Sequence, residues 1–234
     1  MTTELPIALV TGGNRGIGFD VCRQLAEQGY AVILSARDSG KASDAARALG
    51  KQGLQVTPLQ LDVNRAESVT RARDAVEREH GRLDALVNNA GVDYDTDQDV
   101  LTADLERVAR IIDTNTLGPW RVAKAFIPLL RKSDHGRIVN VSSGAGALAS
   151  MNGSRPGYAL SKAALNALTL MLAGMLERDR ILVNAICPGW VATEMGGEGG
   201  RPIPAGAASV VWGVTLPDDG PTGGFFRDGR AVEW

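Results

Sequence analysis

The sequence predicts an α/β fold: a single-domain, doubly wound parallel sheet of about seven strands with helices on both faces. Short apolar runs alternate with longer amphipathic or polar stretches along residues 7–186, a pattern typical of parallel strands joined by helices. A glycine-rich turn follows the first run, and polar residues end several of the others. The 234 residues contain no internal repeat or boundary, so we expect 1–234 to form one domain.

Composition and charge narrow the class of protein. The hydrophobic share of 44% suits a globular core, and the net charge of −2 leaves no basic patch for nucleic acid or an anionic membrane. Cys22 and Cys187 are far apart, and the two histidines are isolated, so we expect no metal site and a reducing, cytoplasmic location. We also expect no signal peptide and no membrane span, because no apolar run approaches roughly 20 residues.

The first apolar run, residues 7–10, leads into Thr-Gly-Gly-Asn-Arg-Gly-Ile-Gly at 11–18. Glycines permit positive φ and close approach to a pyrophosphate, and a helix that starts there offers free N–H groups. This order of strand, turn and helix predicts a Rossmann-type dinucleotide site, although its Gly-x-x-x-Gly-x-Gly spacing is one residue longer than the usual fingerprint. The expected cofactor contacts in the turn are Gly12, Asn14, Arg15, Gly16, Ile17 and Gly18.

The end of the second strand, 31–36, is where the sequence should select between NAD and NADP. Ala36 stands where an acidic residue would hold the ribose 2′-hydroxyl of NAD. Arg37, helped by Arg15, can instead pair with the 2′-phosphate of NADP. The adjacent Asp38 is acidic, and we expect it to turn outward and cap the next helix. Both arginines could otherwise be solvated surface charges. We predict NADP(H) as the cofactor.

The remaining stretches complete the sheet and its helices. Further strands are expected at 56–61, 83–87, 136–142, 181–186 and 223–226. Helices are expected at about 40–51, 64–81 and 158–176, with a long helical region at about 103–131 that Gly118–Pro119 interrupts. Ligands of such sheets bind beyond the carboxyl ends of the strands. That edge should therefore gather Gly12, Arg37, Asp62 and Asn88.

Every second residue from Asp93 to Asp99 is acidic, which superficially resembles a calcium-binding loop. The sharp turn of such a loop needs glycine at the sixth position, which is Gln98 here, and no glutamate closes the loop. We therefore interpret 93–99 as a solvated loop that binds no calcium.

Tyr158 and Lys162 form a Tyr-x-x-x-Lys pair at the start of a predicted helix. Residues four apart share one helix face, so both side chains can reach the same space. A free phenol has a pKa near 10, and a fixed ammonium nearby favours the phenolate and lowers that pKa. The pair predicts a catalytic acid, but the pattern also arises by chance and depends on its context.

The chain as a whole resembles the short-chain dehydrogenase/reductase family. The resemblance rests on Thr-Gly-x-x-x-Gly-Ile-Gly at 11–18, Asn-Asn-Ala-Gly at 88–91, Asn115, Ser143, the Tyr–Lys pair and Pro-Gly at 188–189. Within the family, the segments at 34–38 and 187–195 and the final Val-Glu-Trp are most similar to the carbonyl reductases. This resemblance implies NADPH-dependent reduction of ketones and aldehydes to alcohols.

The resemblance also implies a role for each motif residue. Tyr158 would protonate the carbonyl oxygen as NADPH delivers hydride, and Ser143 would polarise that oxygen. Lys162 would lower the pKa of Tyr158 and hold the nicotinamide ribose, while the Asn115 backbone would anchor a proton-relay water. Alternatively, Asn115 is a satisfied core amide and Thr193 a helix cap. Further cofactor contacts are implied for Asp62, Val63, Asn89, Ala90, Gly91, Pro188, Gly189, Val191 and Thr193.

The substrate side carries weaker signals. Met151, Trp190 and Met195 supply apolar surface, which favours bulky, uncharged, partly aromatic carbonyls, and the glycine-rich segment at about 194–206 is expected to be a flexible lid. Tyr158 follows Ser143 by fifteen positions, whereas animal carbonyl reductases carry a long insertion there that blocks dimer formation. We therefore expect a homodimer or homotetramer paired through the helices at 103–131 and 158–176.

Two other functions remain open. The same site could serve an alcohol dehydrogenase that runs in the oxidative direction, because the sequence does not determine direction. The chain could also be a regulator that binds NADP and has lost catalysis, although Ser143, Tyr158 and Lys162 are intact.

Overall fold

The computed structural model describes residues 5–234, and their strands form one eight-stranded sheet in the order β3-β2-β1-β4-β5-β6-β7-β8. Strands β1 to β7 are parallel, and the short β8 pairs antiparallel with β7. The doubly wound parallel sheet is confirmed, with one strand more than the seven expected. The strands are β1 Ile7–Val10, β2 Ala31–Ala36, β3 Val56–Gln60, β4 Ala85–Asn88, β5 Arg137–Val141, β6 Leu182–Ile186, β7 Phe225–Arg227 and β8 Arg230–Ala231.

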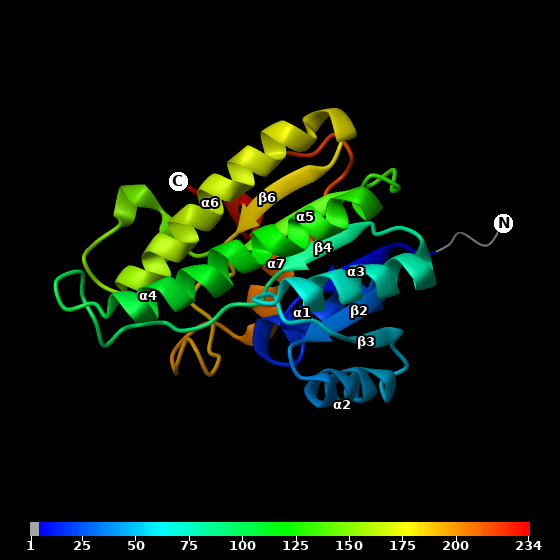
Figure 1. Cartoon of the computed structure of the whole chain (residues 1–234), viewed down its shortest axis with the longest axis horizontal. Coiled ribbons are helices and arrows are strands. Elements are labelled where there is room, and N and C mark those ends of the chain that lie inside the picture. The colour runs from blue at the N-terminus through cyan, green and yellow to red at the C-terminus, as the bar shows by residue number, and fades with distance from the viewer. Residues whose placement is uncertain (1–4) are drawn as a thin grey trace.

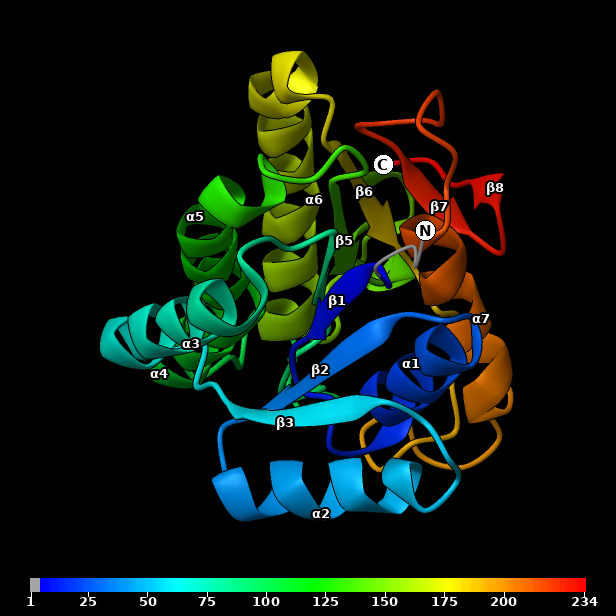
Figure 2. The ribbon, with the colours of Figure 1, turned by 90° about the vertical axis from the view of Figure 1, so that its right-hand side faces the viewer.

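Helices cover both faces of this sheet (Figures 1 and 2). Figure 2 shows α3, α4, α5 and α6 on one side and α1 and α7 on the other. Helix α2 joins the second side, because its apolar residues pack into the same cluster as those of α1 and α7. The helices are α1 Gly16–Glu27, α2 Ser39–Gly50, α3 Ala66–His80, α4 Leu105–Ile112, α5 Gly118–Leu130, α6 Pro156–Leu176 and α7 Ile203–Val214.

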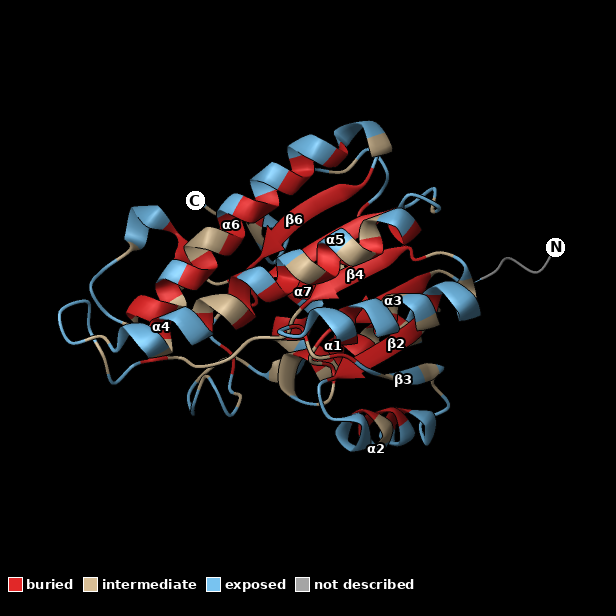
Figure 3. Ribbon diagram, in the orientation of Figure 1, coloured by how far each residue is buried: buried red, intermediate tan, exposed pale blue. Residues whose placement is uncertain are grey.

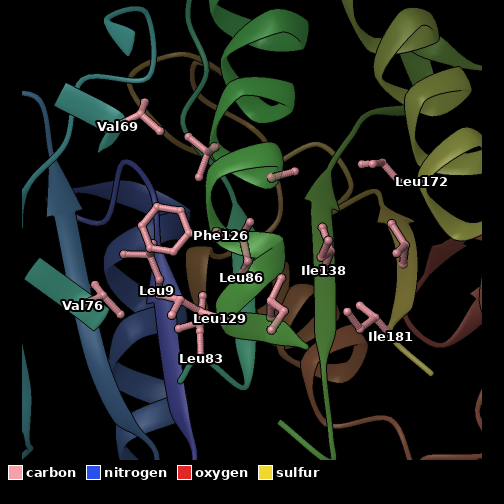
Figure 4. Packing of buried hydrophobic residues seen from close by; sticks show 14 of the residues in the cluster. Leu9, Val69, Val76, Leu83, Leu86, Phe126, Leu129, Ile138, Leu172 and Ile181 are labelled. Atoms are coloured by element: carbon pink, nitrogen blue, oxygen red, sulfur yellow. The ribbon is translucent and has the colours of Figure 1, made fainter. Parts of the chain in front are cut away.

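The larger core cluster lies between the sheet and helices α3, α5 and α6 (Figure 4). In α5, Val122, Phe126 and Leu129 recur at helical spacing and are all fully buried. Leu9 and Leu86 meet them from the sheet. Figure 3 shows the same division along α5 and α6, with buried residues facing the sheet and exposed residues facing outward. Central strands buried on both faces are the expected pattern for a parallel sheet.

The long helical region does not break at Gly118–Pro119, so the expected interruption is wrong. Helix α4 runs through a π-helical turn, Asp113–Leu117, directly into α5, and Pro119 lies in the first turn of α5. Proline is tolerated in a first turn. Gly118 serves packing instead, because a Cβ there would lie 2.8 Å from Val63 Cγ2.

Residues 203–206, at the end of the expected lid, form the first turn of α7, so the irregular part of that segment ends at residue 202. The sequence prediction lacks α7 because its early Pro204 and Gly206 mask an otherwise apolar helix. Beyond β8, the tail folds back over the sheet: the Trp234 ring stacks on Phe225 with centroids 5.5 Å apart. The Trp234 carbonyl also accepts a hydrogen bond from Ala149 N at 3.2 Å.

Among residues 5–234, one helical stretch, Pro156–Asp179, is long and apolar enough to cross a membrane by length and composition. A core helix of a folded domain passes the same test, and 56% of the most apolar window is buried. Leu165, Leu168 and Leu172 of this helix belong to the main core cluster. This packing is that of a core helix.

Candidate active site

A cleft of about 1520 Å³ opens at the carboxyl ends of the strands, beside the glycine turn. Gly12 and Gly16 adopt φ of +64° and +55°, the left-handed region that favours glycine. A Cβ at Gly18 would lie 2.4 Å from the Gly12 oxygen, so the turn and helix α1 pack too closely for any side chain. Within the described chain, no side chain caps the start of α1, so its N–H groups are available to an anion. The turn fits a pyrophosphate.

Most of the predicted cofactor residues line this cleft, but Gly189 and Val191 do not. Val191 is buried and forms a β-bridge with Arg201, so its side chain belongs to the packing of the 188–202 segment. The predicted residues that line the cleft are Gly12, Asn14, Arg15, Gly16, Ile17, Gly18, Arg37, Asp62, Val63, Asn89, Ala90, Gly91, Tyr158, Lys162, Pro188 and Thr193.

Hydrogen bonds join the turn after β1 to the segment after β4. The Asn89 side-chain amide donates to the carbonyls of Thr11 at 2.9 Å and Gly12 at 3.2 Å. In return, the Thr11 hydroxyl accepts from the backbone N–H groups of Asn89 and Ala90, each at 3.0 Å. The floor of the cleft is therefore held in place before a ligand binds.

The far end of the cleft is lined by Arg37 and Lys41 together with Asp38 and Asp44. We call it the cationic end because both carboxylates bind other groups, Asp44 pairing with Arg47 at 2.9 Å. The Arg37 side chain is exposed and has no ion-pair partner within residues 5–234, whereas Arg15 pairs with Glu194 across the mouth of the cleft. Asp38 turns to helix α2, where its Oδ1 accepts from Lys41 N at 2.9 Å, so the expected cap is confirmed. Lys41 also lines this end of the cleft and is absent from the sequence prediction. The sequence could have indicated Lys41, because it is a basic residue in the first turn of the helix that follows Arg37.

Tyr158 and Lys162 lie on the same face of α6, and the Lys162 Nζ is 5.6 Å from the centre of the tyrosine ring. Lys162 is buried and donates to the Val141 carbonyl, at the end of β5, at 2.8 Å. Ser143 follows that strand, and its hydroxyl lies near enough to the Tyr158 phenol to lower the pKa of that phenol. The three side chains predicted to be catalytic therefore converge at the end of β5, beside the cleft.

The pKa of Tyr158 differs from the sequence prediction. Burial of the phenol raises its pKa to about 12, and the neighbouring Ser143 hydroxyl offsets this rise only in part. Burial likewise lowers the pKa of the Lys162 ammonium to about 8. The expected lowering of the Tyr158 pKa is thus wrong, because desolvation of the phenol raises its pKa and Lys162 is not among the groups that shift it.

Asn115 lies in the π-helical turn and is fully buried. Its Oδ1 accepts from Val92 N at 2.9 Å, and its Nδ2 donates to the Val92 carbonyl and to Ser161 Oγ, both at 3.1 Å. The side chain is therefore the satisfied core amide that the sequence left open, and only the Asn115 backbone remains for the proposed water.

The acidic loop 93–99 is solvated in part, as Asp97 and Asp99 are exposed, but Asp95 is buried and Arg107 of α4 pairs with two of the carboxylates. Arg107 pairs with Asp93 at 2.6 Å and with Asp97 at 2.8 Å, and its guanidinium holds the pKa of both carboxyls below their usual range. Asp99 accepts from the backbone N–H groups of Leu101 and Thr102. Asp95 is fully buried. No spacing rule for a single helix or strand marks these partners, because they come from other segments.

The predicted substrate residues are less closely gathered than the catalytic ones. Met195 lines the cleft, whereas Trp190 and Met151 do not. Trp190 is 61% exposed, and its Nε1 donates to the Gly196 carbonyl at 2.8 Å. Thr193 Oγ1 accepts from Gly196 N at 3.0 Å, a local turn cap. No three His, Cys, Asp or Glu side chains in the described chain are grouped so as to hold a metal ion.

This chain belongs to the short-chain dehydrogenase family, whose model matches residues 6–202. It is 34% identical to (+)-neomenthol dehydrogenase of Arabidopsis thaliana and 32% identical to carbonyl reductase (NADPH) 1 of Mus musculus, in each case covering 100% of both chains. The solved structure of NADPH-bound carbonyl reductase from chicken fatty liver superposes with a TM-score of 0.89 at 26% identity, covering 99% of this chain and 100% of that chain.

Proposed function

We propose that this protein uses NADPH to reduce ketones and aldehydes to alcohols. The observation that carries the proposal is the convergence of Tyr158, Lys162 and Ser143 at the end of β5, beside a cleft built to accept a pyrophosphate. The family membership and the similarity to carbonyl reductases that bind NADPH support the same reaction and cofactor.

Bound NADPH would supply the hydride, and side chains of this protein would supply the proton. The hydroxyl groups of Ser143 and Tyr158 lie near each other at the end of β5, where both can contact one carbonyl oxygen. Ser143 would stabilise the charge that develops on this oxygen, and Tyr158 would donate its proton to it. The Lys162 ammonium, fixed by the Val141 carbonyl, would hold the ribose and support the phenolate that is left.

The ionisation state of Tyr158 suits a proton donor. A phenol with a pKa of about 12 is protonated at neutral pH, which is the form that reduction of a carbonyl needs. The same site would catalyse the reverse oxidation from the phenolate, so the direction depends on the supply of substrate and cofactor.

The cofactor's 2′-phosphate would bind at the cationic end of the cleft. Arg37 has an uncommitted guanidinium there, and Lys41 lies beside it on the first turn of α2. A phosphate with two negative charges gains charge-assisted hydrogen bonds from such a pair. Arg15 would join them only after leaving Glu194.

The substrate would be an uncharged carbonyl compound with apolar substituents. Met195 lines the cleft, and Trp190 and Met151 lie on the neighbouring segments. Arg107 pairs with two carboxylates of the acidic loop but carries only one positive charge, so the loop keeps a net negative charge that would disfavour anionic substrates. The irregular segment 194–202 would cover the bound substrate as a lid.

We further propose a homodimer or homotetramer in the cytoplasm. Trp120 of α5 and Leu160, Met171 and Met175 of α6 are exposed apolar side chains on the two helices expected to pair. Exposed apolar surface of this kind marks contact sites between proteins. Both cysteines are buried free thiols, as a reducing compartment allows.

A turnover assay tests the function directly. Purified protein is mixed with NADPH and a reactive diketone, and consumption of NADPH and formation of alcohol are followed. Multiple turnovers are expected, whereas cofactor binding without turnover would establish the silent regulator instead. A panel of ketones, aldehydes, alcohols and keto acids then defines the substrate class, and preference for small keto acids would contradict the apolar pocket.

A further inference from the structure

We propose that Asp95 is a positioning residue for Tyr158, capping from a distant loop the helix that carries the proposed proton donor. The proposal rests on the proposed function for its kinetic consequence, but its structural part concerns only the start of α6. It would make the loop after β4 part of the catalytic apparatus.

The cap consists of two hydrogen bonds to consecutive backbone donors. Asp95 Oδ2 accepts from Gly157 N at 2.8 Å, and Oδ1 accepts from Tyr158 N at 3.0 Å. These N–H groups lie in the first turn of α6, where a helix has no intrahelical acceptors for them. Arg155, at the local capping position, provides no side-chain bond, and Pro156 has no N–H. Asp95 therefore does the work of the absent local cap.

The carboxylate is fully buried and has no ion-pair partner within residues 5–234. A buried charge without a counter-ion is costly unless hydrogen bonds and dipoles compensate it. The two N–H groups and the positive end of the α6 dipole provide that compensation. These backbone hydrogen bonds are the contacts that stabilise the Asp95 carboxylate, so we expect the loop at Asp95 to stay bound to the first turn of α6.

The local backbone makes room for this contact. A Cβ at Gly157 would lie 3.0 Å from Asp95 Oδ2 and 2.6 Å from Ile111 Cδ1, so only glycine allows the approach without a shift. Arg155 adopts a left-handed conformation with φ of +55°, which turns the chain sharply into the helix. Both features allow α6 to begin close to Asp95.

The residue before Asp95 contacts the ring of the same tyrosine. The Tyr94 and Tyr158 rings meet edge to face, with centroids 4.8 Å apart and an interplanar angle of 89°. Tyr94 is itself held by Arg155, whose guanidinium lies 5.0 Å from the Tyr94 ring centre and hydrogen-bonds its hydroxyl. Residues 94 and 95 thus hold Tyr158 by its ring and by its backbone.

Loss of the cap should alter turnover more than binding of the cofactor. Without Asp95 the first turn of α6 would fray, and the phenol would leave the position that a proton transfer requires; small misplacements of reacting groups can cost roughly 100-fold in rate. The NADPH phosphates would bind at the glycine turn and Arg37, which Asp95 does not contact. We expect Asp95→Ala to lower kcat at least tenfold and to change the NADPH Kd less than threefold.

The kinetic test compares Asp95→Ala with Asp95→Asn and with Asp104→Ala. Asn has the size of Asp but keeps only one acceptor oxygen, so it should recover only part of kcat, whereas a merely space-filling role predicts full recovery. Asp104 caps α4 through Glu106 N at 2.9 Å and lies outside the site, so Asp104→Ala controls for loss of a helix cap in general and should retain kcat. Equal kcat in Asp95→Ala and the parent, or equal losses in Asp95→Ala and Asp104→Ala, would overturn the proposal.

Hydrogen exchange provides a readout that needs no turnover. The amides of Gly157 and Tyr158 should exchange at least tenfold faster in Asp95→Ala, with Asp95→Asn between that variant and the parent. Unchanged protection of these amides would refute the cap, whether or not the parent reduces ketones. Absence of reductase activity in the parent, with faster exchange in Asp95→Ala, would instead refute the proposed function and leave the cap established.

Discussion

The cofactor half and the substrate half of this cleft are organised by different means. The cofactor half depends on backbone geometry: Gly12 and Gly16 supply positive φ, and Gly18 permits contact with the Gly12 oxygen. The substrate half depends on polar side chains that bind distant segments. Asp95, for example, accepts hydrogen bonds from backbone N–H groups of Gly157 and Tyr158, which lie 62 and 63 positions further along the chain. A backbone conformation that needs glycine produces a recognisable sequence motif, whereas a contact between residues far apart in the chain produces none.

Tyr158→Phe should separate the two halves most sharply. It removes only the transferable proton, so kcat should fall roughly 10²- to 10⁴-fold, while the NADPH Kd should stay close to that of the parent. Steady-state kinetics and a fluorescence titration with NADPH measure the two quantities. A Phe variant that reduces ketones within a few-fold of the parent would show that Tyr158 is not the proton donor.

Arg37→Ala should act on the cofactor half alone. One hydrogen bond to a charged group contributes roughly 1.5–3 kcal/mol before solvent screening, and Arg37 is exposed, so the ratio of kcat/KM for NADPH over NADH should fall about tenfold. Ala36→Asp should move the preference further toward NADH. Arg78→Ala, at an exposed arginine of α3 that does not line the cleft, is a matched control. A parent enzyme with equal kcat/KM for both cofactors would contradict the assignment.

The pH dependence of reduction should report on Lys162, which belongs to both halves. Its pKa of about 8 means that the ammonium is lost as pH rises through 8, whereas Tyr158, with a pKa of about 12, stays protonated. Reductive kcat/KM should therefore fall above pH 8, by up to about tenfold per pH unit. Lys162→Arg keeps its positive charge and should lack this fall. A parent profile that is flat to pH 10 would be inconsistent with a role for the ammonium.

The smallest effect on activity is expected at the surface behind the substrate half. Met171→Glu places a charge on the exposed apolar face of α6 and should convert the proposed dimer or tetramer into monomers, with kcat changed less than about twofold. Light scattering at micromolar concentration measures the mass. Leu101→Glu, on an exposed loop residue outside this face, is the control. A parent that is already monomeric would rule out this interface.

Much of the fold and of the cofactor half is predictable from the sequence, for physical reasons visible in single segments. Apolar runs marked the central strands, the glycines marked the turn, and Asp38 stood at the expected cap. The position of Arg37 directly after β2 was likewise predictable from the neighbouring residues. The burial of Asp95 was not predictable in this way, because an acidic residue in a loop is usually solvated. Only the folded structure shows that α6 has no side-chain cap of its own.

Two further properties could not be predicted from neighbouring residues alone: the pKa of Tyr158 and the continuity of the helix through residues 103–131. The sequence shows that an ammonium lies one turn from the phenol, but the extent of burial around both groups decides which effect on the pKa is larger. Similarly, Gly118–Pro119 has the composition of a helix break. The structure uses the glycine for contact with Val63, and the helix continues.

The π-helical turn at Asp113–Leu117 has a consequence for insertions and deletions in this gene family. Such a turn accommodates one residue more than a regular helical turn. Deleting one residue there should therefore restore a regular helix and leave the buried faces of α4 and α5 directed at the core. Asn115 would lose the irregular backbone that directs its side chain to Val92. A one-residue deletion in this turn should therefore spare the fold and damage the site.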